Sequence, residues 1–135
     1  MTNKNHKGEV RIPADAENVW KHEIMTAHAL AKAGYSVEFL PAMNNNDTKS
    51  PDILMDGMKW EIKAPKTDKM SAIERNLKRA TKQSGNIIID SQRLHRLQDR
   101  AVQRFLVQKF KQQKTIKRLL FVNRRRETID ISTIV

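Results

Sequence analysis

The chain has 135 residues, no cysteine, and 26 lysines and arginines against 15 aspartates and glutamates, a net charge of +11. This length is typical of one domain that folds without covalent cross-links. The lack of cysteine excludes disulfides, thiolate metal sites and cysteine nucleophiles. No apolar run is long enough to span a bilayer, and the N-terminal MTNKNHKGEV lacks the apolar segment of a signal peptide. We therefore expect a soluble protein with no membrane association and no export signal in its own sequence.

The positive charge is concentrated in one part of the chain. Residues 1–90 hold 14 basic and 12 acidic side chains, whereas residues 91–126 hold 12 basic side chains and one acidic side chain, Asp99. Basic segments of this density suit a polyanion, because neutralising phosphates releases condensed counterions. A solvated helix face is the alternative explanation. We favour nucleic acid as the partner of this segment.

In the first half of the chain we expect, in order, a flexible tail, a helix, a strand and two further strands, over residues 1–14, 17–33, 35–41, 52–55 and 58–63. The tail would precede a single domain over residues 15–135. Gly34 and Pro41 end the helix and the first strand, and a polar loop follows. Asp56-Gly57 lies between the last two strands, which is the sequence typical of a tight hairpin.

In the second half we expect, in order, a helix, a buried strand, a long basic helix and two more strands, over residues 70–84, 86–90, about 92–113, 117–122 and near 128–132. The continuous apolar run NIIID (86–90) is typical of a strand buried on both faces. The order of elements is therefore α-β-β-β-α-β, followed by a basic helix and two further strands. This order predicts an α/β fold in a single domain, with two structural layers around one mixed sheet.

The chemistry is predicted to lie on the hairpin, at Asp52, Glu61 and Lys63 in the pattern S-P-D-x8-E-I-K. Side chains alternate along a strand, so Glu61 and Lys63 share one face while Ile62 faces the core. Asp52 opens the partner strand, so its carboxylate can lie near Glu61. Two carboxylates and a backbone carbonyl are hard oxygen ligands that suit Mg²⁺ or Mn²⁺. A lysine beside them can orient or deprotonate the attacking water and stabilise the charge of the transition state.

An E-x-K pair alone has little value as a motif, because Glu and Lys are common and a solvated hairpin would show the same letters. The preceding Pro51-Asp52, the apolar residue between the pair and the flanking helices favour the catalytic interpretation. Glu23 is a further candidate, since it lies on the apolar stripe of the first helix, where a carboxylate is costly without a cation or donor. A glutamate at the rim of the stripe, paired to a lysine, is an equal alternative.

Other side chains are weaker candidates for contacts with substrate. Gln83 ends the second predicted helix and could donate a hydrogen bond to the site or to a phosphate, although the alternative of an ordinary exposed glutamine is slightly favoured. The remaining candidates are cations and one hydroxyl on the loop and helix after the motif, and the basic turn near the C-terminus: Lys66, Ser71, Lys78, Lys82, Arg124, Arg125 and Arg126. HEIMTAH (22–28) does not satisfy the zincin pattern, because Thr26 stands where the second histidine would be.

The α-β-β-β-α-β order with PD…ExK resembles the core of the PD-(D/E)xK, or restriction-endonuclease-like, nuclease superfamily. The longer pattern E…A..L...G..V..LP…SPDI…G..WEIK…I…L..A..Q…NIIID is similar to the C-terminal tRNase toxin domains of bacterial contact-dependent growth inhibition proteins. This similarity runs from about residue 20 to residue 90, about half of the chain.

The resemblance implies a catalytic set of Glu23, Asp52, Glu61 and Lys63, with Asp52 and Glu61 on the metal. Ser71, Lys82 and Gln83 would be site residues of second rank. It also implies a toxin that cleaves tRNA in the bacterial cytoplasm, is delivered as the C-terminal part of a larger secreted protein, and is blocked by a cognate immunity protein bound over the site.

Two alternatives stay open at this stage. The first is a DNA endonuclease or junction resolvase of the same fold. The second is a basic nucleic-acid-binding module without catalysis, in which the E-x-K pair is a coincidence.

Overall fold

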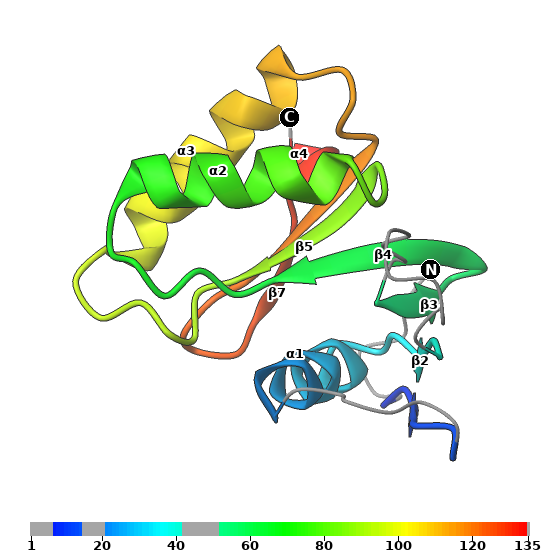
Figure 1. Ribbon diagram of the computed structural model, residues 1–135. Coiled ribbons are helices and arrows are strands. Elements are labelled where there is room, and N and C mark those ends of the chain that lie inside the picture. Colours follow the sequence, from blue (N-terminus) through cyan, green and yellow to red (C-terminus); the bar gives the residue numbers. More distant parts are fainter. Residues whose placement is uncertain (1–6, 15–20, 42–51, 135) are drawn as a thin grey trace.

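The computed structural model describes residues 7–14, 21–41 and 52–134. These residues form one curled, seven-stranded sheet with helices on both faces (Figure 1). The strands are β1 (Val10–Arg11), β2 (Val37–Phe39), β3 (Ile53–Met55), β4 (Met58–Lys63), β5 (Asn86–Asp90), β6 (Arg118–Val122) and β7 (Thr128–Asp130). The helices are α1 (Lys21–Lys32), α2 (Met70–Thr81), α3 (Asp99–Gln112) and α4 (Ile131–Ile134). Among the described residues, no helix has the length and apolar character needed to cross a membrane.

The strands lie in the sheet in chain order, β1 to β7. The parallel pairs are β1–β2, β4–β5 and β5–β6, and each is connected through a helix: α1, α2 and α3. The other neighbours are antiparallel and follow one another without an intervening helix. A parallel crossover needs a long return path, which a helix provides. The sheet is therefore mixed, as the sequence predicts.

Alternation along the central strands divides the core into two halves. Ile88 packs with α1 on one face, whereas Ile87 and Ile89 pack with α2 and α3 on the other. All three isoleucines are fully buried, which confirms the prediction that NIIID is a strand buried on both faces. In Figure 1 the sheet runs between α1 on one side and α2 and α3 on the other.

The tight hairpin predicted at Asp56-Gly57 is confirmed. Met55 pairs with Met58 across the turn, and the two residues between them have φ of 54° and 73°. Positive φ at both positions is the geometry of a type I′ turn, which matches the right-handed twist of the flanking strands. The turn therefore fixes the register of β3 against β4, and with it the position of the motif.

The predicted order of elements is present, with two additional short elements. Residues 10–11 lie in the predicted tail but form β1, which pairs with β2. The last predicted strand ends at Asp130 and is followed by α4, where Ser132 Oγ accepts the backbone N–H of Leu119 at 2.7 Å. The first helix is described from residue 21, so its predicted start at residue 17 lies outside the described residues.

The long basic helix predicted from about residue 92 begins only at Asp99. The segment 91–98 is held in an irregular conformation because the Asp68 carboxylate accepts the backbone N–H groups of residues 95, 96 and 97 at 2.9–3.1 Å. Gln98 then takes an extended conformation, with φ of −76° and ψ of 143°. A side chain from another part of the chain thus replaces the first helical turns that the local sequence favours.

Candidate active site at the carboxyl end of strand β4

Strand β4 carries the two charged residues of the motif on one face. Trp60 and Ile62 are buried in the core on the α1 side, so Glu61 and Lys63 point to the opposite face, which α2 covers. Lys63 Nζ lies 3.3 Å from Glu61 Oε2. Glu61 is 4% exposed, whereas the Lys63 side chain keeps 23% of its surface in solvent. The pair therefore opens to solvent through the lysine.

Asp52 joins this pair from the neighbouring strand. Its backbone N–H donates to Trp60 O at 2.9 Å, and its carboxylate accepts the backbone N–H of Ile62 at 2.8 Å. The carboxylate thus accepts a β4 backbone N–H in place of a strand carbonyl at the end of the hairpin, and it lies beside Glu61. Asp52, Glu61 and Lys63 are brought together as the sequence predicts.

The two carboxyl groups resist ionisation. Burial raises the pKa of Glu61 to about 8, with a further increase from the nearby Asp52 carboxylate and a partial offset from Lys63. Burial also raises the pKa of Asp52, opposed by the hydrogen bond from Ile62 and by the charge of Lys63. Adjacent carboxyl groups whose pKa values are raised by burial are typical of a functional site.

These residues suit a small, hard divalent cation. Glu61 Oε1 is buried and has no hydrogen-bond partner, an arrangement that is costly unless the atom binds a cation or a donor. Among the described residues there is no group of three or more His, Asp or Glu side chains arranged to hold a metal ion. The donor set of two carboxylates resembles the partial protein coordination that Mg²⁺ and Mn²⁺ accept, with water and substrate oxygens completing the shell.

Glu23 lies in the first turn of α1 and is half-buried. This end of the helix adjoins the carboxyl end of β5, because Gln92 Nε2 donates to His22 O at 2.9 Å and Thr26 Oγ1 donates to Asp90 Oδ2 at 2.6 Å. β5 is the strand next to β4, and Lys63 pairs with Ile89. Glu23 is thus at the same edge of the sheet as the motif, and its catalytic role stays a prediction.

The candidates on α2 and the loop before it are exposed cations and one exposed hydroxyl: Lys66, Ser71, Lys78 and Lys82. The spacing of the last three places them on one solvent-facing stripe of α2. Gln83 differs from them, because its Oε1 is buried without a hydrogen-bond partner. It follows the end of α2, beside Ser84, whose Oγ donates to Lys59 O at 2.8 Å. Gln83 therefore lies toward the start of β4, away from Lys63.

The three consecutive arginines of the β6–β7 turn have different surroundings. Arg126 donates to both carboxylate oxygens of the fully buried Asp90, at 2.8 and 2.9 Å. Arg124 donates to the backbone carbonyls of Leu94 and Leu97 at 3.1 and 2.8 Å. Only Arg125 is exposed without such contacts among the described residues. Two of the three side chains expected to bind phosphates thus make hydrogen bonds to other parts of the chain.

Arg93 is a site residue that the sequence did not predict. Its Nε donates at 2.9 Å to the carbonyl of Ala64, the residue that follows Lys63, and its Nη2 donates to the same oxygen. Burial lowers the pKa of His22, and the charge of Arg93 lowers it further, against a smaller opposite effect of Asp90. A guanidinium and a neutral imidazole therefore lie at the edge where β4 and β5 end. Topology was the one sequence-level indication for Arg93, because it follows a predicted strand and ligands of α/β sheets bind at the carboxyl ends of strands.

One comparison with known proteins identifies a family, and a second identifies a similar fold. Residues 49–128 match the family described as contact-dependent growth inhibition CdiA C-terminal domain. The structure is similar to a solved chain of a CdiA-CT/CdiI toxin and immunity complex from Burkholderia pseudomallei, with a TM-score of 0.63 and 16% sequence identity over 91% of this chain and 98% of that chain. At this identity the structural similarity shows a common fold. A comparison with curated proteins finds no match.

Proposed function

Since this chain belongs to the contact-dependent growth inhibition CdiA C-terminal domain family, we propose that it is a bacterial toxin domain that acts as a metal-dependent endonuclease. Its substrate is nucleic acid, with tRNA preferred, and its reaction is hydrolysis of a phosphodiester bond. The observation that carries this proposal is the buried pair of Asp52 and Glu61 with Lys63 at 3.3 Å from Glu61. The arrangement is that expected of the PD-(D/E)xK nuclease superfamily, to which we assign the fold.

Each residue has a separate task in this proposal. Asp52 and Glu61 would hold Mg²⁺ or Mn²⁺, which supplies polarisation of a phosphate oxygen and activation of water. Lys63, which is partly exposed to solvent, orients the attacking water and offsets negative charge that develops on the phosphate. Glu61 has a pKa of about 8 in the absence of a cation, so it must release its proton before it can serve as a ligand. Glu23 supports the site from α1.

The edge of the sheet contributes binding groups as well. Arg93 is fixed by the carbonyl of Ala64, one residue beyond Lys63, so its guanidinium is directed without large motion of its own. A fixed guanidinium is suited to the non-bridging oxygens of a phosphate. The exposed cations on α2 would contact the substrate backbone beyond the cleaved bond, without reading its sequence.

The partner and the place of action follow from the same family assignment. The similar structure is titled as a toxin and immunity complex, which supports a cognate immunity protein as the partner of this chain. A partner for so basic a surface gains rate and specificity from acidic residues. We place the activity in the cytoplasm of a target bacterium, with delivery as the C-terminal part of a larger secreted protein.

The test is incubation of the purified protein with total tRNA and with plasmid DNA, side by side, in Mg²⁺ and in EDTA. We expect tRNA to be cleaved in Mg²⁺, and cleavage to stop with EDTA and in Glu61→Gln. The matched control is Glu74→Gln. This variant removes a carboxylate of α2 that pairs with Lys109 of α3, and it should cleave tRNA normally. Activity that persists in EDTA would contradict the metal role, and cleavage of plasmid alone would make the protein a DNase.

The non-catalytic alternative makes a different prediction. A basic binding module would bind RNA and DNA in a salt-sensitive manner, cleave neither with any metal, and be unaffected by Glu61→Gln. Expression in bacteria gives a second assay. Wild type should arrest growth and Asp52→Ala should relieve the arrest at equal expression, whereas equal growth of both would remove the toxin assignment.

A further inference from the structure

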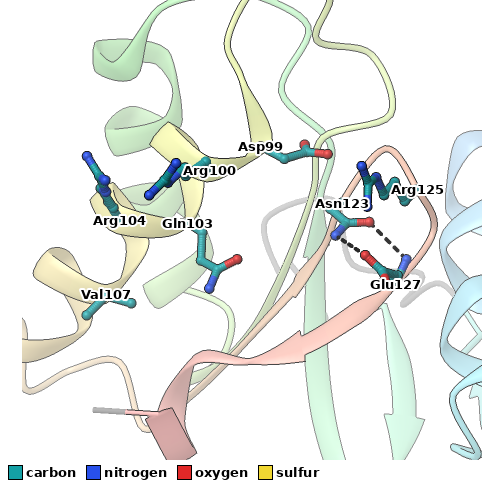
Figure 2. A pocket seen from close by; sticks show the side chains of 8 residues that line it. All are labelled: Asp99, Arg100, Gln103, Arg104, Val107, Asn123, Arg125 and Glu127. Carbon is teal, nitrogen blue, oxygen red and sulfur yellow. Dashed lines mark hydrogen bonds between the residues drawn. The ribbon is translucent and has the colours of Figure 1, made fainter.

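A groove of about 670 Å³ lies between α3 and the turn that joins β6 to β7. Figure 2 shows helix residues on one side of it and turn residues on the other. The helix side presents two arginines, Arg100 and Arg104, and the amide of Gln103. The turn side presents Arg125. This surface is separate from the carboxylate pair described above.

The acidic residues of the groove are already engaged within the protein. Asp99 accepts the hydroxyl of Ser91 and the backbone N–H of Arg124, each at 2.9 Å, and its carboxylate lies 3.7 Å from Arg124 Nε. Glu127 accepts the side-chain amide of Asn123 at 3.0 Å, drawn as a dashed line in Figure 2. Both carboxylates are therefore turned to partners of their own.

The arginines of the groove are not engaged in this way. Within the described part of the chain, Arg100, Arg104 and Arg125 have no hydrogen bond or ion pair to a carboxylate. Arg100, Arg104 and Arg125 are exposed. The three arginines outnumber the two carboxylates that line the groove, and the remaining positive charge would be stabilised by an external anion.

The turn that presents Arg125 is rigid. Arg126 has a left-handed backbone, with φ of 63°, and its guanidinium is fixed on buried Asp90. On the other side, the backbone N–H of Arg124 is fixed to Asp99 at the start of α3. The backbone of Arg125 is therefore held on both sides by contacts of its neighbours, which lowers the entropy cost of binding a ligand there.

The spacing of the cations indicates the class of ligand. In Figure 2 the guanidinium groups of Arg100 and Arg104 lie apart from that of Arg125 and do not converge on one point. A single phosphate ion would not contact all three, whereas a chain of phosphates would. The groove also lies at the end of the sheet that carries the active site, since Asp90 pairs with Val122 next to the turn. β6 lies two strand spacings from β4, roughly 10 Å.

We infer that this groove binds the phosphate backbone of the nucleic-acid substrate beside the point of cleavage. The inference rests on the proposed nuclease function and names the surface that captures its substrate. Phosphate contacts by arginines position a nucleic acid and depend strongly on salt. Arg125 is the single residue of the basic turn that takes part, because its two neighbours are used to build the turn.

The experiment measures binding of fluorescently labelled total tRNA to the inactive Glu61→Gln protein, as a function of salt concentration. The groove variant carries Arg100→Ala, Arg104→Ala and Arg125→Ala. Its matched control removes three exposed cations outside the groove, with Lys111→Ala, Lys114→Ala and Lys117→Ala. We expect the groove variant to bind at least tenfold more weakly and its slope of log Kd against log salt to fall by about 2, at roughly 0.7–0.9 per lost contact. The control should change far less, and thermal melts should show both variants folded.

Equal losses in the two variants would mean that total charge alone governs binding, which would overturn the inference. No loss in the groove variant would overturn it as well. A third arm uses poly-glutamate as the probe: loss of its binding with tRNA binding intact would assign the groove to an acidic protein instead. Cleavage of tRNA by wild type is measured in parallel, so that failure of the groove and failure of the nuclease function are distinguished.

Discussion

Replacing Glu61 by Gln should stabilise the metal-free protein at alkaline pH. Burial and the neighbouring Asp52 raise the pKa of Glu61 from an ordinary 4.5 to about 8. Below pH 4.5 the carboxyl is neutral in the folded and the unfolded chain. Between pH 4.5 and 8 the unfolded chain releases the proton that the folded chain keeps, so stability falls as pH rises. Glutamine has no charge to bury and avoids this loss.

The size of the effect follows from the pKa. The interval from pH 4.5 to 8, at about 1.4 kcal/mol per pH unit, gives an upper bound of about 5 kcal/mol for the stability that wild type loses by pH 8. The contact of Glu61 with Lys63 at 3.3 Å is already included in this value, because the charge of Lys63 is one of the effects that set the pKa of Glu61. After allowance for relaxation of the coupled pair we expect a net gain of about 2 kcal/mol. For a domain of this size that raises Tm by about 5–10 °C at pH 8.

The assay is thermal unfolding in EDTA, followed by circular dichroism at pH 5, 6.5 and 8. The Tm of Glu61→Gln minus that of wild type should be near zero at pH 5 and grow toward pH 8. Glu74→Gln is the control, because Lys109 lowers the pKa of Glu74 and loss of that carboxylate should not raise Tm. A difference between Glu61→Gln and wild type that does not change with pH would show that Glu61 is not a buried carboxyl of raised pKa. The proposed basis for cation binding would then fail.

Three further predictions follow from other contacts. Arg126→Ala leaves the buried carboxylate of Asp90 without a cation, so the variant should lose about 3–5 kcal/mol of stability in urea unfolding. Arg125→Ala should change stability by less than about 0.5 kcal/mol, and equal losses in the two variants would contradict the structural role of Arg126. Arg93→Ala should lower kcat for tRNA cleavage by roughly tenfold or more, with a smaller change in KM, and Arg93→Lys should recover part of the lost kcat. A change in KM alone would make Arg93 a binding residue. Backbone N–H groups lower the pKa of Asp68 to about 2, so the stability that this carboxylate contributes is present above pH 4 and is lost as pH falls toward 2. The Tm of Asp68→Asn should therefore lie below that of wild type at pH 7 and equal it near pH 2. A difference in Tm that stays constant over this range would refute the role of Asp68.

The sequence predicted the hairpin and the motif on it because both depend on local rules. Asp56-Gly57 selects the type I′ turn through positive φ, and the turn sets which residues of β3 and β4 face each other. Alternation then places Glu61 and Lys63 on one face. No contact from elsewhere in the chain is needed for these statements, and the structure confirms each of them.

The predicted start of the basic helix was wrong because it depends on a contact from a distant part of the chain. Residues 92–98 favour a helix locally, but Asp68 binds their backbone N–H groups from 27 to 29 residues away. A carboxylate so distant in the sequence leaves no trace in local composition. The same holds for Arg93, whose position beside the motif depends on a carbonyl 29 residues earlier.

The basic segment, residues 91–126, shows most clearly what the sequence determines and what the tertiary structure determines. Composition alone determined that residues 91–126 carry an excess of positive charge, and therefore that an anionic partner is favoured. Only the tertiary structure decided which cations remain for that partner, since the guanidinium groups of Arg124 and Arg126 pair with Asp99 and Asp90. Charge is a sum over residues and can be counted from the sequence. The availability of a charged side chain depends on what folds against it, which is set by contacts between distant parts of the chain.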